Sequence, residues 1–234
     1  MAYLEGKNLV ASYGVVPILH ECSVEVEKGE LAVIVGPNGA GKSTVMRVLL
    51  GMLEATSGSV KFDGKDISTL TTQERINHGL AFVPQTKNVF PSMTVEENLQ
   101  MGGFIRKDDI SKTIEEVYEL FPILHEKRKQ LAEQLSGGQR QQVAFGRAMM
   151  TRPSVMLLDE PTAGVSPIVM DEIFSNILDV RNAGMAVLMV EQNAQQALNI
   201  ADKGYVLVSG RNEHTGTGKD LINNPEVRKK FLGG

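Results

Sequence analysis

The sequence predicts an α/β fold in which a largely parallel sheet is interrupted by a mostly helical segment. Short apolar runs bounded by turn residues predict strands in the first and last parts of the chain, and the stretch between them has the 3.6-residue periodicity of helices. One apolar run also leads directly into a glycine-rich segment of the kind that binds phosphate groups. Together these patterns indicate a phosphate-binding sheet that is built from both ends of the chain.

Four apolar runs predict strands near the N-terminus. Turn signals at Lys28-Gly29 and Asp63-Gly64 help to separate them. The predicted strands cover residues 3–10, 22–26, 31–35 and 59–62. This part of the chain is therefore the start of a mixed α/β domain.

Residues 36–44 read Gly-Pro-Asn-Gly-Ala-Gly-Lys-Ser-Thr and fit the G-x-x-x-x-G-K-[ST] phosphate-loop pattern. The loop follows the predicted strand 31–35, and its glycines allow successive backbone N–H groups to face an anion at the start of a helix. A glycine-rich turn without a ligand is the alternative, but the strand before the loop favours phosphate binding. The predicted nucleotide ligands are Gly36, Asn38, Gly39, Gly41, Lys42, Ser43 and Thr44.

Two side chains of this loop have specific predicted roles. Lys42 reaches the outer phosphates of a nucleoside triphosphate, and Ser43 can hold Mg²⁺. The helix that follows is predicted to end near Gly51. Its predicted apolar face contains Val45, Val48, Leu49 and Met52.

The middle of the chain, from about residue 109 to residue 150, has helical periodicity. The basic run 127–129 is predicted to be a solvated helix face. One apolar face precedes Pro122, which interrupts the helix, and it contains Ile110, Ile114, Val117, Leu120 and Phe121. We expect a mostly helical insertion here.

Strands return after Arg152-Pro153. Apolar runs at 155–158 and 186–190 predict two strands, with a helix over residues 168–181 between them. This βαβ passage is consistent with parallel strands whose ligand lies at the strand ends. Beyond residue 200 we predict only short strands and a helix over residues 225–231.

Two carboxylates, Asp159 and Glu160, follow the predicted strand 155–158. Phosphate-loop proteins use an acid at this position to hold the Mg²⁺ shell, and we assign that role to Asp159. Because adjacent strand residues point to opposite faces, we expect Glu160 to point toward an attacking water that it could orient or deprotonate. An acidic turn before Pro161 is the alternative, and the phosphate loop makes the functional interpretation the better one.

A second candidate anion site is the segment 135–139, Leu-Ser-Gly-Gly-Gln, which precedes a predicted helix. A hydroxyl and backbone N–H groups at a helix N-terminus stabilise negative charge. Taken alone, the segment would be an ordinary helix cap. Beside a phosphate loop and paired acids it is predicted to bind phosphate, with the ligands Ser136, Gly137, Gly138 and Gln139.

Composition narrows the class of protein. The net charge of −4 over 234 residues gives no reason to expect nucleic acid as a partner. Cys22 is the single cysteine, so a reducing compartment is expected, and the four histidines are too scattered to suggest a metal site. No apolar run approaches the roughly 18 residues that span a bilayer, and the N-terminus lacks a signal-peptide pattern. We expect a cytoplasmic protein unless a partner holds it at a membrane.

The combination of motifs resembles the nucleotide-binding subunit of ATP-binding-cassette (ABC) transporters over essentially the whole chain. The phosphate loop, the signature at 135–139 and the acidic strand at 155–160 match this family. Gln85 matches its glutamine loop, which contacts Mg²⁺ or its water and moves with a membrane-facing groove. Tyr13 falls where the family stacks an aromatic ring on adenine, and packing at a strand edge is the alternative role.

The resemblance implies a phosphate-loop NTPase core of RecA-like type, with an N-terminal antiparallel β-subdomain and an inserted α-helical subdomain. In a single ABC ATPase domain, residues 1–85 and 153–234 would form the catalytic core, and residues 86–152 the helical, signature-bearing subdomain. The resemblance also implies head-to-tail dimers, in which each ATP lies between one chain's phosphate loop and the other chain's signature. ATP binding would close the dimer, and hydrolysis would reopen it.

A narrower similarity is to the ATPases of branched-chain amino-acid importers, in particular the shorter of their two ATPases. Urea and short-chain amide importers are close relatives of that group. The similarity implies a second ABC ATPase and transmembrane permease subunits as partners, and indirectly a periplasmic solute-binding protein. It places the chain on the inner face of the cell membrane, as a peripheral subunit. The residues that carry it are 89–99, Phe121-Pro122 with Arg128 and Leu131, and 190–193.

Two positions depart from the wider family. Gln192 stands where most members carry a switch histidine, and a glutamine can hydrogen-bond the γ-phosphate but cannot relay a proton. We therefore predict that Glu160 dominates the activation of water, with Gln192 and Gln85 as further catalytic residues. Ser166-Pro167 stands where the family usually has an aspartate in a loop that contacts the opposite subunit.

Two other classes of protein share some of these features. A soluble cassette ATPase in assembly work, such as iron–sulfur cluster delivery, would share every catalytic residue, and co-purification with membrane proteins would distinguish it. A nonenzymatic, nucleotide-gated scaffold is disfavoured because Lys42, Asp159 and Glu160 are all present.

Overall fold

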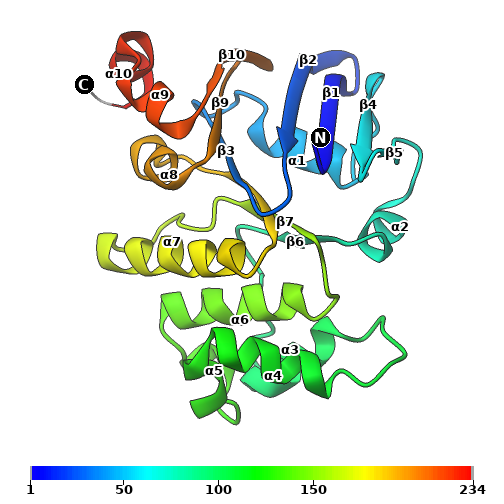
Figure 1. Cartoon of the computed structure of the whole chain (residues 1–234), viewed down its shortest axis with the longest axis vertical. Coiled ribbons are helices and arrows are strands. Elements are labelled where there is room, and N and C mark those ends of the chain that lie inside the picture. The colour runs from blue at the N-terminus through cyan, green and yellow to red at the C-terminus, as the bar shows by residue number, and fades with distance from the viewer. Residues whose placement is uncertain (1, 233–234) are drawn as a thin grey trace.

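The computed structural model describes residues 2–232, and within that range the strands form two sheets (Figure 1). The larger sheet has the strand order β10-β9-β3-β8-β7-β6, and its neighbours are parallel except for β9 with β10. The smaller sheet has the order β2-β1-β4-β5 and is antiparallel. This arrangement confirms the predicted α/β fold, with a mostly parallel sheet and an N-terminal antiparallel sheet.

The strands of the larger sheet are short, and the central ones are apolar on both faces. The apolar runs β3, β7 and β8 suit parallel strands that are covered on both sides. The strands of this sheet are β3 (Leu31–Val35), β6 (Leu80–Val83), β7 (Val155–Asp159), β8 (Ala186–Val190), β9 (Lys203–Val208) and β10 (Arg211–Gly216).

Strands β1 and β2 of the smaller sheet are longer, with 10 and 11 residues, and they mix buried and more exposed residues. In β2, for example, Cys22, Val24 and Val26 are buried, as expected for an antiparallel sheet with one face on the core. The strands are β1 (Leu4–Tyr13), β2 (Val16–Val26), β4 (Ser57–Phe62) and β5 (Lys65–Asp66).

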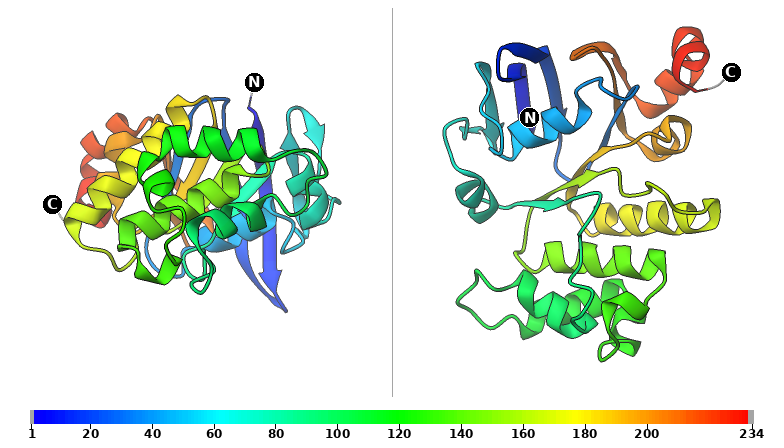
Figure 2. Two further views of the ribbon diagram at one scale, coloured as in Figure 1. Left: turned by 90° about the horizontal axis from the view of Figure 1, so that it is seen from below. Right: turned by 180° about the vertical axis from the view of Figure 1, so that it is seen from behind.

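The helices lie against the larger sheet or gather at one end of the molecule. Helices α3 to α6 follow β6 and precede β7, and they form the end opposite to β1 and β4 (Figures 1 and 2). The helices are α1 (Lys42–Leu49), α2 (Thr72–Asn77), α3 (Val95–Gly102), α4 (Ser111–Leu120), α5 (Pro122–Glu126), α6 (Gly137–Met149), α7 (Pro167–Asn182), α8 (Ala194–Ile200), α9 (Gly218–Asn223) and α10 (Pro225–Phe231), with a 3₁₀ turn at Ala132–Gln134. No helix within residues 2–232 has the length and apolar character needed to cross a membrane.

Strand β3 separates two apolar cores. Leu31, Val33 and Val35 belong to the core that also contains the buried residues of α3, α4, α6 and α7. Ala32 and Ile34 belong to the core between the two sheets, around α1. Because one core runs from β3 into the helical end, the division of the chain at residues 85–86 and 152–153 stays a prediction.

Two local expectations were wrong, and a third was incomplete. Met52 lies beyond the end of α1 and is 52% exposed, because the chain turns at Gly51 before Met52 can return to the apolar face. The basic run 127–129 lies in a turn after α5 rather than on a helix face. Pro122 does interrupt the helical run, but it also starts a new helix, where proline's missing N–H costs no hydrogen bond.

Candidate nucleotide-binding site

The phosphate loop joins the end of β3 to the start of α1, as the sequence predicts. Its first residue, Gly36, has a φ of 150°, and a Cβ atom there would lie 2.1 Å from the carbonyl oxygen of Leu207 on β9. Only glycine fits so close to that backbone. The loop therefore runs tightly over the end of the sheet, with α1 directed away from it.

Lys42 is the first residue of α1, and its side chain folds back over the loop. Its Nζ atom donates hydrogen bonds to the carbonyl oxygens of Gly36 (2.9 Å) and Pro37 (3.1 Å). Burial lowers the pKa of Lys42, and the carboxylates of Glu160 and Asp159 oppose that shift. Anionic groups near this amine favour its charged form, so the loop holds a cation in a place where a phosphate can approach it.

Ser43 and Asp159 meet across the end of the sheet. The Ser43 hydroxyl donates a 3.3 Å hydrogen bond to Oδ1 of Asp159. Burial raises the pKa of Asp159, and the hydrogen bond from Ser43 partly offsets this. No cluster of three His, Cys, Asp or Glu side chains that could hold a metal is found within residues 2–232. A hydroxyl and a carboxylate alone suit a Mg²⁺ ion that also binds phosphate oxygens.

Glu160 follows β7 and has a φ of 46°, which is uncommon for a residue with a side chain. Its N–H donates to the carbonyl of Val190 at 2.9 Å. Its Oε2 accepts hydrogen bonds from Nε2 of Gln85 (2.9 Å) and Nε2 of Gln192 (2.7 Å). The backbone of Glu160 turns into the left-handed region directly after the strand, so strand alternation alone does not set the direction of its side chain.

Two hollows meet at Glu160. The first, of about 310 Å³, is lined by Ile18, residues 38–44 of the phosphate loop and Glu160. The second, of about 350 Å³, is lined by Gln85, Glu160, Gln192 and the loop that follows β7. Glu160 therefore lies between the phosphate loop and the two glutamines. This is the place that a water attacking a terminal phosphate would need.

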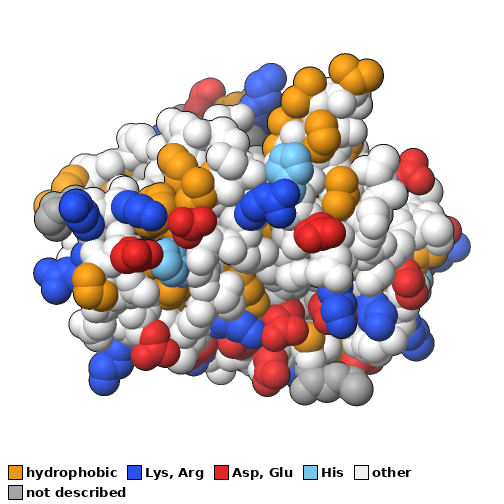
Figure 3. Space-filling model, turned by 90° about the horizontal axis from the view of Figure 1, so that it is seen from above, with side chains coloured by type: hydrophobic (Ala, Val, Ile, Leu, Met, Phe, Trp, Pro, Cys, Tyr) orange, Lys and Arg blue, Asp and Glu red, His pale blue; other side chains and the backbone are white. Residues whose placement is uncertain are grey.

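Tyr13 ends β1 at the tip of the β1–β2 hairpin and is 47% exposed. Arg47 of α1 donates a 2.9 Å hydrogen bond to its hydroxyl and lies 5.8 Å from its ring centre. Tyr13 does not line the phosphate hollow in the described chain. Figure 3 shows hydrophobic side chains gathered on the projecting hairpin, where Val15 and Val16 are also exposed.

The segment Ser136–Gln139 caps the N-terminus of α6 and does not meet the phosphate loop of its own chain. The Ser136 hydroxyl accepts from the N–H of Gln139 (3.2 Å), and Oε1 of Gln139 accepts from the N–H of Ser136 (3.1 Å). Ser136 is exposed, while α1 and its loop lie on the other side of the larger sheet from α6 (Figure 1). Ser136 is therefore open to another molecule, whereas Gly138 in the same segment is buried.

One buried acid beside the site was not predicted. Glu191 is 1% exposed and accepts hydrogen bonds from the N–H and the hydroxyl of Thr162 (3.0 and 2.8 Å). Burial raises its pKa, which the bonds from Thr162 partly offset. The available signal was its place directly after the apolar run of β8, the same pattern that identified Asp159. Glu191 joins the loop after β7 to the segment that carries Gln192.

The comparison with known proteins agrees with this geometry. Residues 19–163 match the ABC transporter family model. This chain belongs to the ABC transporter family. It is an ATPase of that family, and the match includes the phosphate loop, the capped segment before α6 and the acidic strand.

Several relatives are similar over their whole length. The chain is 46% identical over 223 residues to the high-affinity branched-chain amino acid transport ATP-binding protein BraG of Pseudomonas aeruginosa, covering 95% of this chain and 96% of that one. It is 38% identical over 228 residues to a probable branched-chain amino acid transport ATP-binding protein, LivF, of Archaeoglobus fulgidus, covering 97% of each. It is 35% identical over 237 residues to the lipopolysaccharide export system ATP-binding protein LptB of Haemophilus influenzae, covering 100% of this chain and 98% of that one.

One solved structure has the same fold as this chain over its whole length. The ADP conformation of an ATP-binding cassette of an ABC transporter superposes with a TM-score of 0.90 at 32% identity, and each chain is covered completely. This chain therefore has the fold of an ATP-binding cassette, with its phosphate loop at the end of β3.

Proposed function

We propose that this chain is the ATP-hydrolysing subunit of an ABC importer for branched-chain amino acids. The observation that carries the proposal is the placement of Glu160 between the phosphate loop and two glutamine amides, because it combines a nucleotide site with a group that can activate water. Similarity over the whole chain to a branched-chain amino acid transport ATP-binding protein supports the choice of solute.

In this proposal the chain binds ATP through the phosphate loop and the β1–β2 hairpin. The backbone N–H groups of residues 36–44 and the amine of Lys42 hold the phosphates, and the N-terminus of α1 adds its positive dipole end. Tyr13 stacks on adenine, for which its exposed ring at the hairpin tip is suited. Arg47, which contacts the same ring, keeps Tyr13 near α1.

Mg²⁺ is the proposed metal, held by Ser43 and Asp159 with help from Gln85. The two oxygen donors lie 3.3 Å apart and are of the hard type that Mg²⁺ prefers. When bound, the ion neutralises charge on the phosphates and polarises them. The ionised carboxylate of Asp159 is the form that would bind the ion; burial raises the pKa of Asp159, and the hydrogen bond from Ser43 partly offsets that rise.

Hydrolysis depends on Glu160 as the general base. Its carboxylate takes a proton from the attacking water, while the amides of Gln85 and Gln192 hold Oε2 in place. Neither glutamine can accept that proton in exchange, because an amide has no titratable group in the physiological range. Glu160 is therefore the proposed catalytic residue, and Gln85 and Gln192 assist it.

The second half of each ATP site comes from another ABC ATPase, either a second copy or a different subunit. Ser136, Gly137, Gly138 and Gln139 would bind the γ-phosphate of the ATP held by that partner. Ser136 is exposed and Gly137 and Gln139 are half-buried at the start of α6, which supports this role, whereas Gly138 is buried. ATP then joins the two subunits, and its hydrolysis removes the contact that holds them closed.

Transmembrane permease subunits would dock on the helical subdomain, residues 86–152. This region exposes the large apolar side chains of Phe90, Met101, Phe104 and Ile105. Such a surface suits a short helix from a membrane protein. The chain would thus sit as a peripheral subunit on the inner face of the membrane, working with a periplasmic solute-binding protein and with no nucleic acid.

Other solutes and other kinds of ABC ATPase are alternatives, and the purification experiment described below distinguishes them. A urea or short-chain amide importer would use the same catalytic residues, as would a soluble assembly ATPase for iron–sulfur clusters. The 35% identity to a lipopolysaccharide export ATPase adds an exporter as a further candidate.

Affinity purification of the full-length chain from native membranes, followed by mass spectrometry, tests the proposal. We expect two permeases, a second ATPase and a solute-binding protein, and leucine uptake that is lost in Lys42→Ala. Purification without any membrane protein would overturn the transporter assignment. Co-purification with lipopolysaccharide-export components, or unchanged leucine uptake in Lys42→Ala, would overturn the assignment of branched-chain amino acids as the transported solute.

A further inference from the structure

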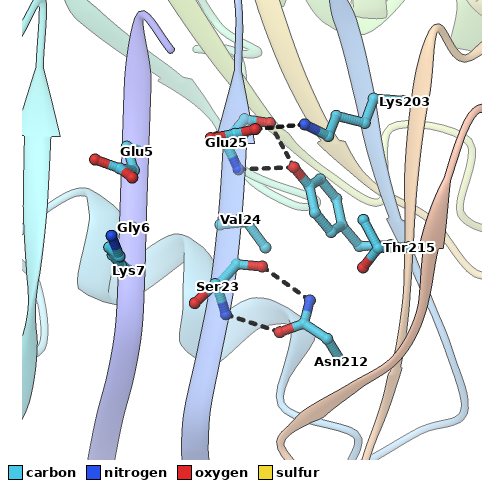
Figure 4. Close-up of a pocket in the computed structure, with 10 residues that line it drawn as sticks. Glu5, Gly6, Lys7, Ser23, Val24, Glu25, Lys203, Asn212 and Thr215 are labelled. Carbon is cyan, nitrogen blue, oxygen red and sulfur yellow. Dashed lines mark hydrogen bonds and ion pairs between the residues drawn. The ribbon is translucent and has the colours of Figure 1, made fainter. Parts of the chain in front are cut away.

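Strand β2 lies at the edge of the smaller sheet, and side chains of the larger sheet bind the backbone groups of two of its residues, Ser23 and Glu25. Asn212 of β10 accepts from the N–H of Ser23 (2.7 Å) and donates to the carbonyl of Ser23 (2.8 Å) (Figure 4). The Tyr205 hydroxyl of β9 accepts from the N–H of Glu25 (2.9 Å) and donates to its carbonyl (3.0 Å). Each side chain thus replaces one residue of a neighbouring strand.

These contacts border a hollow of about 450 Å³ between the two sheets. Its walls come from β1, β2, β9 and β10, and Lys203 crosses it to pair with Glu25 at 2.5 Å. Burial raises the pKa of Tyr205 to about 12, so its hydroxyl stays protonated and can donate to the carbonyl of Glu25. The two sheets are therefore joined here by polar side chains rather than by close apolar packing.

The turn between β9 and β10 makes a third contact, directly with the phosphate loop. The N–H of Gly210 donates to the carbonyl of Ala40 in that loop, and the carbonyl of Gly210 accepts from the N–H of His20 on β2, both at 2.9 Å. Gly210 has a φ of 75°, and a Cβ atom there would lie 1.9 Å from the carbonyl oxygen of Ile18. The turn therefore fills the space between the phosphate loop and β2.

All three contacts fall along β2, at His20, Ser23 and Glu25. The same strand begins at Val16, close to the hairpin tip that carries Tyr13. A displacement of β2 along or away from the β9–β10 hairpin would move Tyr13 relative to the phosphate loop. A ring that must stack on a base while the loop holds the phosphates tolerates little such displacement.

We infer that the β9–β10 hairpin sets the spacing between the phosphate-binding and base-binding parts of the nucleotide site, with Asn212 and Tyr205 as positioning residues. This inference rests on the proposed stacking of adenine on Tyr13. Neither residue touches the nucleotide in this arrangement. They act through β2, which they hold in place. The tip of the β1–β2 hairpin, with Tyr13, then stays at the distance from the phosphate loop that one ATP molecule spans.

Equilibrium binding to the full-length chain tests the inference, with MgATP and inorganic tripolyphosphate as the two probes. The variants are Asn212→Asp and Tyr205→Phe, which keep side-chain size, and the control is Thr215→Val in the wall of the same hollow. Asn212→Asp replaces a donor facing the Ser23 carbonyl by an acceptor. We expect the Kd for ATP to rise about fivefold or more, the lower end of what a lost stacking contact costs. The Kd for tripolyphosphate should stay within about twofold, because the phosphate loop is retained.

A double variant separates positioning from general damage. Tyr13→Ala combined with Asn212→Asp should bind ATP no more weakly than Tyr13→Ala alone, because the two changes remove the same contact. Equal losses for ATP and tripolyphosphate, additive losses in the double variant, or unchanged ATP binding in both Asn212→Asp and Tyr205→Phe would overturn the inference. If Tyr13→Ala binds ATP as the unaltered chain does, the adenine assignment fails and this inference fails with it. If Tyr13→Ala loses affinity for ATP while Asn212→Asp and Tyr205→Phe do not, only this inference fails.

Discussion

Gln192 donates a 2.7 Å hydrogen bond to Oε2 of Glu160, the same oxygen that accepts from Gln85 at 2.9 Å. Two neutral amides from different loops therefore hold one carboxylate oxygen. Within residues 2–232 no hydrogen bond to Oε1 of Glu160 is found, and Oε1 is the atom that remains to accept a proton. The amides orient the carboxylate, and the carboxylate is the only one of the three groups that can take up a proton.

This arrangement predicts unequal effects on ATP hydrolysis in the assembled complex. Glu160→Gln should lower kcat by about 10²–10⁴-fold, the usual contribution of a general base. Gln192→Ala should lower it only about tenfold, because it removes one neutral hydrogen bond while Gln85 still holds the carboxylate. Steady-state phosphate release measures both, with Gln195→Ala on the exposed side of α8 as the control. A larger loss in Gln192→Ala than in Glu160→Gln would reverse the assigned roles.

Asp159→Asn should stabilise the chain in the absence of nucleotide and Mg²⁺. Burial raises the pKa of Asp159 above 3.8, so the folded protein binds this proton more tightly than the unfolded chain does. The charged carboxylate therefore lowers stability once the pH rises through and above that raised pKa. The variant should melt higher by roughly 2–4 °C at pH 7, and the gain should shrink as the pH falls toward 4.

Thermal unfolding between pH 4 and pH 8 measures this effect, and Asp171→Asn on the exposed face of α7 is the control. In the presence of MgATP the order should invert, because the variant loses a proposed ligand of the metal. A variant that melts lower than the unaltered chain at pH 7 without nucleotide would contradict the buried-charge account.

Arg75 should be essential for the stability of the phosphate-loop helix. It is 3% exposed and donates to the carbonyl oxygens of Val48 (2.7 Å) and Leu49 (2.8 Å) at the end of α1, and to those of Ser68 and Leu70. A cation at this end of a helix also complements its dipole. Arg75→Met should lower the free energy of unfolding by about 2–4 kcal/mol, because buried carbonyl groups lose their donors.

Urea denaturation of the full-length chain measures the loss, and Arg228→Met on the exposed side of α10 should change the free energy of unfolding by less than about 0.5 kcal/mol. A value for Arg75→Met as small as that of the control would show that water replaces the guanidinium at the end of α1.

Local patterns predicted much of this fold, and contacts between distant residues account for what they missed. The strands Leu31–Val35 and Ala186–Val190 and the helix Pro225–Phe231 have the predicted bounds, because an apolar run or a leading proline defines each of them. Helix α3 was not predicted, although its capping box, Thr94 with Glu97, was readable.

In the site, too, local sequence patterns predicted some features, and contacts between distant residues determine others. The phosphate loop and Asp159 are signalled by their own neighbours in sequence, and the structure brings Ser43 and Asp159 together. The direction of Glu160 depends on a left-handed turn that no strand pattern specifies. Asn212 gave no local signal at all, because its partner Ser23 lies 189 residues away in the chain.

Ser136→Arg should prevent ATP-dependent association while leaving ATP binding by its own chain intact. The reason is that Ser136 caps α6 on an exposed surface and does not line the phosphate hollow of its own chain. In the Glu160→Gln background, where bound ATP is not consumed, the chain should associate with the ATPase that co-purifies with it, or with a second copy.

Adding Ser136→Arg should abolish that complex in size-exclusion chromatography with MgATP, and the Kd for ATP of the separate chain should change by less than about twofold. Ser111→Arg, at the start of α4, is the matched control at another exposed helix terminus. If Ser136→Arg weakens ATP binding by the separate chain as strongly as it weakens association, the signature acts within its own subunit, and the head-to-tail arrangement is wrong.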